Sequence, residues 1–379
     1  MRVLIACGGT GGHINPGLAI ADIIKSKYPD AEFLFAGTPK GMESKLVPKA
    51  GYRLETIKVA GFQRKISFEN IGRNAKAVAY LATSGKRAKE IIRNFKPDIA
   101  IGTGGYAAGP VIRKAAKMGI PTAIHEQNAY PGVTNKLLSK EVDFVMLTVI
   151  EALDFMDKSK FEYAVTGLPV RSNINTMSKA EARKKLGMDD SFTILSFGGS
   201  LGAGCINDTM TETIKWHTKN NLRINHIHGY GGMGKDSFPQ AMKEAGIPLK
   251  SNRLRITEYI NDMDVCLAAA DLVICRSGAS TLAELEAAGK ASILIPSPIV
   301  AGNHQYHNAM VLGKAGAAVV IEQKDVTNDK IVAEIENLYN SPDKVEIMSE
   351  CAARLHLSDT NSRILAVIDK LLSKGTSSP

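Results

Sequence analysis

The chain lacks the features that mark membrane-spanning, secreted and metal-binding proteins. None of its apolar runs reaches the roughly 18–20 residues that a membrane-spanning helix needs. Residues 1–3 lead directly into an expected strand, so we expect no signal peptide. Cysteine is scarce and scattered, without the spacing of a metal site, which favours a reduced, cytoplasmic setting. The five cysteines are Cys7, Cys205, Cys266, Cys275 and Cys351.

Acidic residues are nearly missing from one long stretch. Between Lys58 and Lys96 the chain carries ten basic residues and only two acidic ones, Glu69 and Glu90, so this stretch accounts for +8 of the formal net charge of +9. A basic surface attracts nucleic acid, anionic lipid or an anionic substrate. Nucleic acid is the least favoured partner, because aromatic residues make up only 6% of the chain and no nucleic-acid-binding motif accompanies the charge.

Apolar residues within this basic stretch, from Phe68 to Leu81, lie near helical spacing. Cationic residues flank them, among them Arg64, Lys65, Arg73 and Lys76. Two interpretations fit this pattern. The helix can lie on an anionic bilayer surface, or it can face the core with a solvated basic side.

A glycine-rich turn stands near the start of the chain. The apolar run at residues 3–6 leads through Cys7 into GGTGGH, which ends at His13, and a helix is expected from Gly17 to Lys27. A strand, a glycine turn and a helix start together bring backbone N–H groups close to a ligand. The alternative is a tight turn that binds nothing. His13 should lie on this loop and face any ligand that the glycine turn binds.

This turn lacks two features of the common nucleotide-binding motifs. The dinucleotide fingerprint needs a glycine where Ile14 stands, and an acidic residue where the second expected strand ends in Ala36-Gly37. The lysine of ATP-binding loops is absent from this turn and from the two other glycine turns of the chain, at residues 102–105 and 198–202. Nicotinamide-dependent dehydrogenases and ATP hydrolases are therefore disfavoured.

Expected strands and helices alternate along the chain, which indicates βαβ units and a parallel α/β fold. The opening pattern returns at residues 193–203, where a strand leads into GGSLGA and a helix. Gly8 and Gly198 stand 190 positions apart, half of the 379 residues, and so long a chain exceeds one ordinary core. We therefore expect two similar α/β domains in tandem, joined by a linker at residues 166–171.

Polar residues gather where expected strands end and helices begin, which is where open parallel sheets bind ligands. The segment HEQN at residues 125–128 ends one strand. In the second half, Ser200 and the pair Ser280-Thr281 stand at helix starts that favour a phosphate. Glu284, one turn further, suits a ribose diol or is a solvated helix residue. These placements favour a site in a cleft between the domains.

Six motifs now occur in a fixed order from Met1 to about Gly316: GGTGGHINPGLA, GGY with HEQN, TGLPVR, GGSLGA, SGASTLAE and HQYHNA. By these motifs the chain resembles the bacterial MurG family, the UDP-N-acetylglucosamine–N-acetylmuramyl-(pentapeptide) pyrophosphoryl-undecaprenol N-acetylglucosamine transferases. Two positions depart from the family pattern. Leu168 replaces the asparagine of TGNPVR, and Leu201 replaces the glutamine of GGSQGA.

The resemblance implies the glycosyltransferase B fold, an α/β architecture of two Rossmann-like domains facing across a cleft. Residues 1–165 would form an N-terminal domain that takes the lipid acceptor and faces the membrane, with the helix at about 350–379 packing back on it. Residues 166–349 would bind UDP-GlcNAc. The implied reaction moves GlcNAc, with inversion, to the 4-hydroxyl of MurNAc in undecaprenyl-pyrophosphoryl-MurNAc-pentapeptide (lipid I to lipid II), a step of cell wall biogenesis that serves cell shape, cell division and the cell cycle.

The resemblance also implies which residues bind the donor. Uracil would lie against the backbone at Ile260, under Tyr259, and Glu284 would take the ribose. Ser200, Ser280 and Thr281 would bind the diphosphate, and Gln305 would bind the hexose. The remaining residues that the resemblance implies for donor binding are Thr10, Gly11, Gly12, Asn128, Arg171 and His304.

On the acceptor side, the pyrophosphate of lipid I would meet the glycine turns at Gly11-Gly12 and Gly104-Gly105. The implied acceptor residues are Gly104, Gly105, Tyr106, His125, Glu126 and Asn128. Displacement of UDP needs a general base opposite the leaving group. His13 is the first candidate, because an unperturbed histidine titrates near neutrality, and Glu126 is the second.

Helix N-termini and Arg171 would stabilise the departing diphosphate, so neither Mg²⁺ nor another cofactor is required. A lipid acceptor implies work at a membrane, so we expect Phe68–Leu81 and its cationic rim to dock on the anionic inner leaflet, at the cytoplasmic face. The alternatives are a UDP-sugar 2-epimerase and a diacylglycerol glycosyltransferase of the same fold. HEQN and GGTGGH favour the muramyl acceptor.

Overall fold

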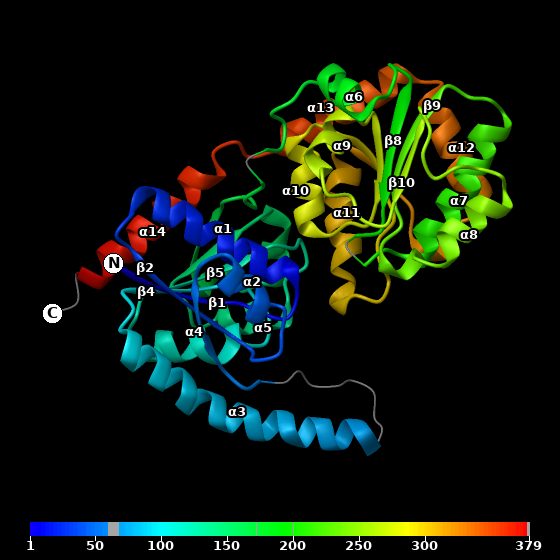
Figure 1. The fold of residues 1–379 in the computed structure, drawn as a ribbon. Helices are drawn as coiled ribbons and strands as arrows, with labels where there is room; N and C mark the ends of the chain where they lie inside the picture. Colours follow the sequence, from blue (N-terminus) through cyan, green and yellow to red (C-terminus); the bar gives the residue numbers. More distant parts are fainter. Residues whose placement is uncertain (60–67, 172, 200, 377–379) are drawn as a thin grey trace. The chain divides into compact units, whose positions relative to one another are not determined.

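The computed structural model describes residues 1–59, 68–171, 173–199 and 201–376 (Figure 1). The chain divides into two compact units. The first contains Met1–Pro169 and the tail that begins at Asp359, and the second is Val170–Ser358. Both observed boundaries come later in the chain than expected. The first unit continues to Pro169 instead of ending at residue 165, and the tail joins it from Asp359 instead of from about residue 350.

The first unit is built on a seven-stranded sheet whose described pairs are all parallel, in the order β3-β2-β1-β4-β5-β6-β7. Most strands are short apolar runs buried on both faces, as parallel sheets covered by helices require. The strands are β1 (Arg2–Ala6), β2 (Glu32–Gly37), β3 (Arg53–Thr56), β4 (Ile99–Gly102), β5 (Thr122–Glu126), β6 (Phe144–Leu147) and β7 (Glu162–Val165).

Helices cover both faces of this sheet because alternate strand residues point to opposite sides. One face packs against α3 (Phe68–Phe95), α4 (Ala108–Lys117), α5 (Val133–Leu138) and the 3₁₀ turn η1 (Ile150–Phe155). The other face packs against α1 (Gly11–Lys27), α2 (Glu43–Lys49) and α14 (Thr360–Thr376). A second 3₁₀ turn, η2 (Lys158–Lys160), precedes β7.

Helix α3 begins at Phe68 and continues past the expected end at Leu81, alongside α4 (Figure 1). Its last part buries Ala88, Ile91 and Phe95 against the sheet. The side chains of residues 68–79, 81 and 82 lie outside the described part of the chain, and so does the flanking segment 60–67. The expected docking face of Phe68–Leu81 is therefore not described. Among the described residues, no helix combines the length and the apolar character needed to cross a membrane.

The tail returns to the first unit as helix α14, beside α1 (Figure 1). Asp369 accepts hydrogen bonds from Tyr28 Oη at 2.5 Å and from Lys27 Nζ at 2.6 Å. Ile364 and Ile368 are fully buried in the core beneath α1. The apolar stripe and these polar ties together explain why a segment so late in the sequence packs on the first unit.

The second unit is built on a six-stranded sheet whose described pairs are also parallel, in the order β10-β9-β8-β11-β12-β13. One face packs against α7, α8 and α12, and the other against α9, α10 and α11. The strands are β8 (Phe192–Phe197), β9 (Ile224–Gly229), β10 (Leu254–Thr257), β11 (Leu272–Cys275), β12 (Ala291–Leu294) and β13 (Ala318–Val320). The helices are α6 (Lys179–Leu186), α7 (Gly204–Lys219), α8 (Ser237–Glu244), α9 (Met263–Ala269), α10 (Ala279–Ala287), α11 (His304–Lys314), α12 (Asn328–Tyr339) and α13 (Pro342–Leu355), and the 3₁₀ turns are η3 (Gly232–Gly234), η4 (Ala301–Asn303) and η5 (Gln323–Asp325).

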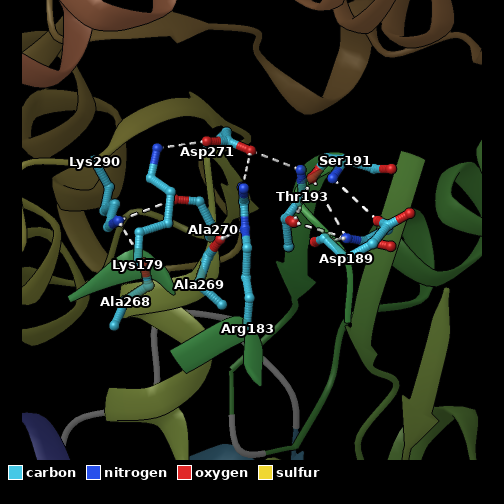
Figure 2. A network of polar contacts seen from close by, with 11 residues as sticks. Lys179, Arg183, Asp189, Ser191, Thr193, Ala268, Ala269, Ala270, Asp271 and Lys290 are labelled. Atoms are coloured by element: carbon cyan, nitrogen blue, oxygen red, sulfur yellow. Dashed lines mark hydrogen bonds and ion pairs between the residues drawn. The ribbon is translucent and has the colours of Figure 1, made fainter. Parts of the chain in front are cut away.

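A polar network joins α6, α9 and the amino-terminal edge of this sheet (Figure 2). The Asp271 carboxylate, just before β11, accepts from Arg183 Nη2 at 2.5 Å, from Lys179 Nζ at 2.6 Å and from the Thr193 backbone N–H at 2.7 Å. Lys290 Nζ and Arg183 Nε donate to the last carbonyls of α9, at residues 268–270. Cations near a helix C-terminus are favoured by the helix dipole, so this network stabilises the edge opposite the candidate donor site.

Candidate functional site

The first glycine turn lies at the carboxyl end of β1. Gly9 has a φ of +91°, a conformation that favours glycine. Helix α1 begins at Gly11, earlier than the expected start at Gly17, so Gly11 and Gly12 form its first turn and Thr10 is the N-cap. The N–H groups of a first helical turn have no partner within the helix, and the dipole there favours an anion. The turn is therefore suited to a phosphate.

His13, the third residue of α1, is half-buried beside this turn. Its Nδ1 lies 3.2 Å from the carbonyl oxygen of Gly8 and 3.4 Å from Thr10 Oγ1. A carbonyl oxygen can only accept a hydrogen bond, so this contact assigns the proton to Nδ1 and the lone pair to Nε2. The ring is thereby prepared to accept a proton at Nε2.

The second glycine turn, after β4, packs directly against the first. Gly104 has a φ of +107°, and a Cβ atom there would lie 2.7 Å from His13 Cδ2. Gly105 has a φ of +82°, and its Cβ would lie 2.1 Å from the Gly8 oxygen. Thr103 Oγ1 donates to the His13 carbonyl at 2.7 Å. The structure thus brings the predicted residues Gly104 and Gly105 to His13, and the neighbouring Tyr106 is 59% exposed.

His125 does not line an acceptor pocket, which corrects the sequence-based prediction. Its ring is fully buried, with Nε2 donating to the Gly167 oxygen at 3.0 Å and Nδ1 accepting from Gln127 Nε2 at 3.1 Å. Burial lowers the pKa of His125 to about 4, against the opposing effect of the Gly167 hydrogen bond. This neutral ring joins β5 to the segment that follows β7.

Glu126 is also buried, with 1% of its surface exposed, and this argues against it as the catalytic base. Its Oε1 accepts from the backbone N–H and the side-chain amide of Asn128, at 2.9 and 3.1 Å. Its Oε2 accepts from the Gly132 N–H at 3.0 Å and from Asn135 Nδ2 at 2.8 Å. A carboxylate that holds four donors stabilises the turn at residues 128–135 and leaves His13 as the candidate base. Its predicted contact with the acceptor is also inconsistent with this burial.

The candidate donor site lies on the second unit, where α10 begins at Ala279. Ser280 and Thr281 fall in its first turn, behind the N-cap Gly278. Both hydroxyls therefore stand at the positive end of the helix dipole, as phosphate binding requires.

Glu284, one turn into α10, is paired with the linker residue Arg171. Its Oε1 accepts from Arg171 Nε and Nη2, both at 2.8 Å. The Glu284 side chain is 18% exposed and that of Arg171 is 51% exposed. Burial raises the pKa of Glu284, and the Arg171 charge and hydrogen bonds oppose this effect. A nucleotide bound here would therefore contact the Arg171–Glu284 ion pair, not two independent side chains.

The other predicted donor residues follow the carboxyl ends of β10 and β12. Tyr259 is 57% exposed and Ile260 is buried. Gln305 Oε1 accepts from the Ser297 N–H at 2.9 Å, and His304 Nδ1 donates to the Ala301 oxygen at 2.9 Å. Ser200 lies outside the described residues. Thr10, Gly11, Gly12 and Asn128 belong to the first unit.

Sequence reasoning missed Glu43, a fully buried carboxylate on α2 beneath the first glycine turn. It accepts from the Gly9 N–H at 3.1 Å, and from the N–H and hydroxyl of Thr38 at 2.8 and 2.6 Å. Burial raises its pKa, but these hydrogen bonds outweigh burial and hold the pKa below its usual value. The sequence pattern gives no signal for this position. In the structure, Cβ atoms at Gly37 and Gly41 would lie 2.5 and 2.2 Å from Glu43 atoms, so these two glycines leave the room that its side chain occupies.

Across the described parts of both units, no group of three or more His, Cys, Asp or Glu residues is arranged to hold a metal ion.

Two family models match the chain, one within the first unit and one mainly within the second. The glycosyltransferase family 28 N-terminal domain matches residues 3–147, and the family 28 C-terminal domain matches residues 193–364. A UDP-N-acetylglucosamine–N-acetylmuramyl-(pentapeptide) pyrophosphoryl-undecaprenol N-acetylglucosamine transferase from Acetivibrio thermocellus is 46% identical over 374 residues, 98% of each chain. A protein of the same name from Desulforamulus reducens is 42% identical over 99% of this chain and 100% of its own.

A solved structure is also similar. The crystal structure of MurG from Acinetobacter baumannii aligns with a TM-score of 0.78 and 27% identity, covering 97% of this chain and 99% of that one. Together with the two parallel sheets, these matches confirm the expected two-domain glycosyltransferase B fold.

Proposed function

Because the chain belongs to the family of UDP-N-acetylglucosamine–N-acetylmuramyl-(pentapeptide) pyrophosphoryl-undecaprenol N-acetylglucosamine transferases, we propose that it transfers GlcNAc from UDP-GlcNAc to lipid I and so makes lipid II. It is a hexosyltransferase of peptidoglycan synthesis. The observation that carries this conclusion is 46% identity along nearly the whole chain, through both units. Such relatives do not favour a UDP-sugar 2-epimerase or a diacylglycerol glycosyltransferase.

The first unit takes the acceptor, with His13 as the general base. Nε2 of His13 accepts the proton of the MurNAc 4-hydroxyl while that oxygen attacks the anomeric carbon of GlcNAc. The bond from that carbon to the UDP oxygen breaks on the opposite face, which inverts the configuration. The assigned Nδ1–H tautomer and the glycine contacts around the ring support this role. The glycine turns at Gly11-Gly12 and Gly104-Gly105 receive the acceptor pyrophosphate.

The second unit takes the donor. The first turn of α10, with Ser280 and Thr281, holds the diphosphate, and Glu284 holds the ribose. Arg171, already beside Glu284, neutralises the leaving UDP. Tyr259 covers the uracil at Ile260, and Gln305 with His304 reads the hexose.

The leaving diphosphate is stabilised by these donors without a bound metal ion, so no cofactor is needed. Chelation with EDTA should leave turnover within about twofold of the untreated enzyme, because Arg171 and the helix N-termini supply the positive charge. Loss of turnover on chelation, restored by Mg²⁺, would contradict this part of the proposal.

The enzyme acts as a peripheral protein at the cytoplasmic face of the cell membrane, docked through Phe68–Leu81 and its cationic flanks. The basic stretch between Lys58 and Lys96 supports this placement. A variant with several of these Arg and Lys residues changed to Glu should sediment less with vesicles of phosphatidylglycerol. Undiminished sedimentation would refute the docking surface.

Release of UDP from UDP-GlcNAc tests the proposed reaction. With a lipid I analogue present, UDP and a lipid II analogue should form in equal amounts, and without acceptor the release should be slow. Rapid release without acceptor, or the appearance of UDP-ManNAc, would indicate an epimerase instead.

A further inference from the structure

Two hydrogen bonds meet on one peptide group of the first glycine turn. The carbonyl of Gly8 and the N–H of Gly9 belong to the same planar peptide unit. On one side, Glu43 Oε2 accepts from that N–H at 3.1 Å. On the other side, Nδ1 of His13 donates to that carbonyl at 3.2 Å. A buried carboxylate and the candidate base are therefore linked through a single peptide.

We propose that Glu43 is a positioning residue that orients and polarises His13 through the Gly8–Gly9 peptide group. This inference rests on the proposed role of His13 as the base. The carboxylate withdraws the N–H proton toward itself, and amide resonance passes the electron density to the Gly8 oxygen. A more negative oxygen is a better acceptor for Nδ1–H, so the lone pair stays on Nε2, where the sugar hydroxyl is expected.

The chemistry follows a common pattern in which a base is oriented by a third group. In the usual case a carboxylate contacts the imidazole directly. Here the peptide stands between the two, so the negative charge is kept away from the site that receives an anionic acceptor. The hydrogen bonds from Thr38 and Gly9 hold the pKa of Glu43 low and keep it ionised.

The glycines around the turn make this arrangement possible. A Cβ at Gly8 would lie 2.6 Å from Glu43 Oε1 and would push the carboxylate away from the peptide. A Cβ at Gly105 would collide with the Gly8 oxygen that receives His13. Gly8 and Gly105 are therefore required to be glycine by the close packing on both sides of this peptide group, in addition to any requirement of the turn conformation.

Substitution Glu43→Gln tests the proposal with little change in volume. The amide has no charge and only one acceptor oxygen, so it cannot serve Gly9 and Thr38 as the carboxylate does. We expect kcat to fall about 10- to 100-fold, while KM for UDP-GlcNAc stays within about twofold because the proposed contacts with the uracil, ribose and diphosphate at Tyr259, Glu284 and α10 are on the other unit.

The spectroscopic readout does not depend on activity. In full-length protein labelled with ¹⁵N-histidine, the ring-nitrogen shifts of His13 report which nitrogen carries the proton, and the His13→Gln variant identifies its signals. The wild type should show the Nδ1–H tautomer, and Glu43→Gln should populate the Nε2–H tautomer. If the wild type transfers no GlcNAc, the proposed function fails, while the tautomer still tests the link.

The matched control is Asp369→Asn, which also removes a hydrogen-bonded carboxylate from the first unit. Asp369 binds Lys27 and Tyr28 at the C-terminal end of α1, whereas His13 lies in the first turn of that helix. It should leave the His13 shifts and kcat unchanged even if stability falls. A folded Glu43→Gln protein with wild-type shifts and kcat would overturn the proposal. If Glu43→Gln does not fold, the His13 shifts of the wild-type protein are the test. An Nε2–H tautomer in the wild type would overturn the proposal, and an Nδ1–H tautomer would support it.

Discussion

The glycine turns after β1 and β8 each contain a glycine with a positive φ, Gly9 at +91° and Gly199 at +93°, but they differ in what supports them. The first turn has the buried Glu43 carboxylate behind it and is followed by His13. The second is supported by backbone: a Cβ at Gly202 would lie 2.3 Å from the Tyr230 oxygen, and one at Gly231 would lie 2.3 Å from the Gly202 nitrogen. In both turns, glycine allows neighbouring backbone or side-chain atoms to pack close to the main chain. The two turns differ in the side chains beside them.

The histidines show the same contrast between the two units. His13 lies half-buried at a turn, whereas His217, His226 and His228 form a buried chain with Ser196 in the core of the second unit. Burial is the main cause that lowers the pKa values of these three rings. The histidines of the second unit therefore belong to its core, whereas His13 is placed where the proposed role of a base requires it, at the start of a helix beside a glycine turn.

Among the predicted changes in activity, the fall in turnover of His13→Ala should be the greatest. Loss of the general base should lower kcat about 10²- to 10⁴-fold, while KM for UDP-GlcNAc changes little. Release of UDP in the presence of a lipid I analogue measures both constants. An equal loss in kcat and donor affinity would make His13 a binding residue and remove the chemical difference between the two turns.

The next largest effect is on stability, in Asp271→Ala. Removing this carboxylate leaves Arg183, whose side chain is 8% exposed, as an uncompensated buried cation in the network of Figure 2. Breaking a buried pair in this way costs about 3–5 kcal/mol of the free energy of unfolding. Denaturant unfolding measures the loss, and Arg354→Ala, which breaks the exposed pair with Glu350, is the control expected to unfold close to wild type. Equal stability of the two variants would contradict this reading of the network.

Sequence patterns predict most of the fold because strands and glycine turns depend on local signals. The apolar runs of β1, β2, β6, β8 and β11 and the linker before Val170 are visible in the residues themselves. The edge strands β7 and β13 were not predicted. They are short and only partly buried, and Glu162 and Tyr163 of β7 are polar or exposed, so no periodic apolar signal marks that strand.

The candidate site was predicted only in part, because a polar cluster at the end of a strand can bind a ligand or hold the fold. The spacing of HEQN does not reveal that Glu126 is occupied by Gly132 and Asn135, or that His125 is enclosed. Glu43 was missed for the opposite reason. It stands in a short amphipathic segment, and only the fold places it beneath Gly9.

Acidification should destabilise the second unit more than the first. Burial lowers the pKa to about 4 for His217 and about 3 for His228, and lowers it well below the usual value for His226, whereas the first unit buries His125, with a pKa of about 4. In the unfolded chain these rings titrate near 6.5, so below that pH the unfolded state binds more protons and stability falls as pH falls.

Between pH 7 and pH 6 the loss should be about 2 kcal/mol for the second unit and about 0.7 kcal/mol for the first. Hydrogen exchange read by mass spectrometry, corrected for the intrinsic exchange rate, measures the protection of peptides from each unit. Equal losses in the two units would show that the histidine chain of the second unit does not set its acid sensitivity.

A smaller effect is expected in the donor site, from Glu284→Gln. Loss of the charge weakens both the ribose contact and the pair with Arg171, and KM for UDP-GlcNAc should rise about tenfold with little change in kcat. Glu286→Gln, two residues along the same helix and on another face, is the matched control. A fall in kcat without a change in KM would place Glu284 in the chemical step instead.

The affinity of free enzyme for UDP-GlcNAc, measured by calorimetry in His13→Ala and Glu284→Gln, tests the division of labour most directly. We expect His13→Ala to bind the donor as wild type does, and Glu284→Gln to bind it about tenfold more weakly. Donor binding weakened as much by His13→Ala as by Glu284→Gln would contradict the assignment of the base to the first unit and the donor to the second.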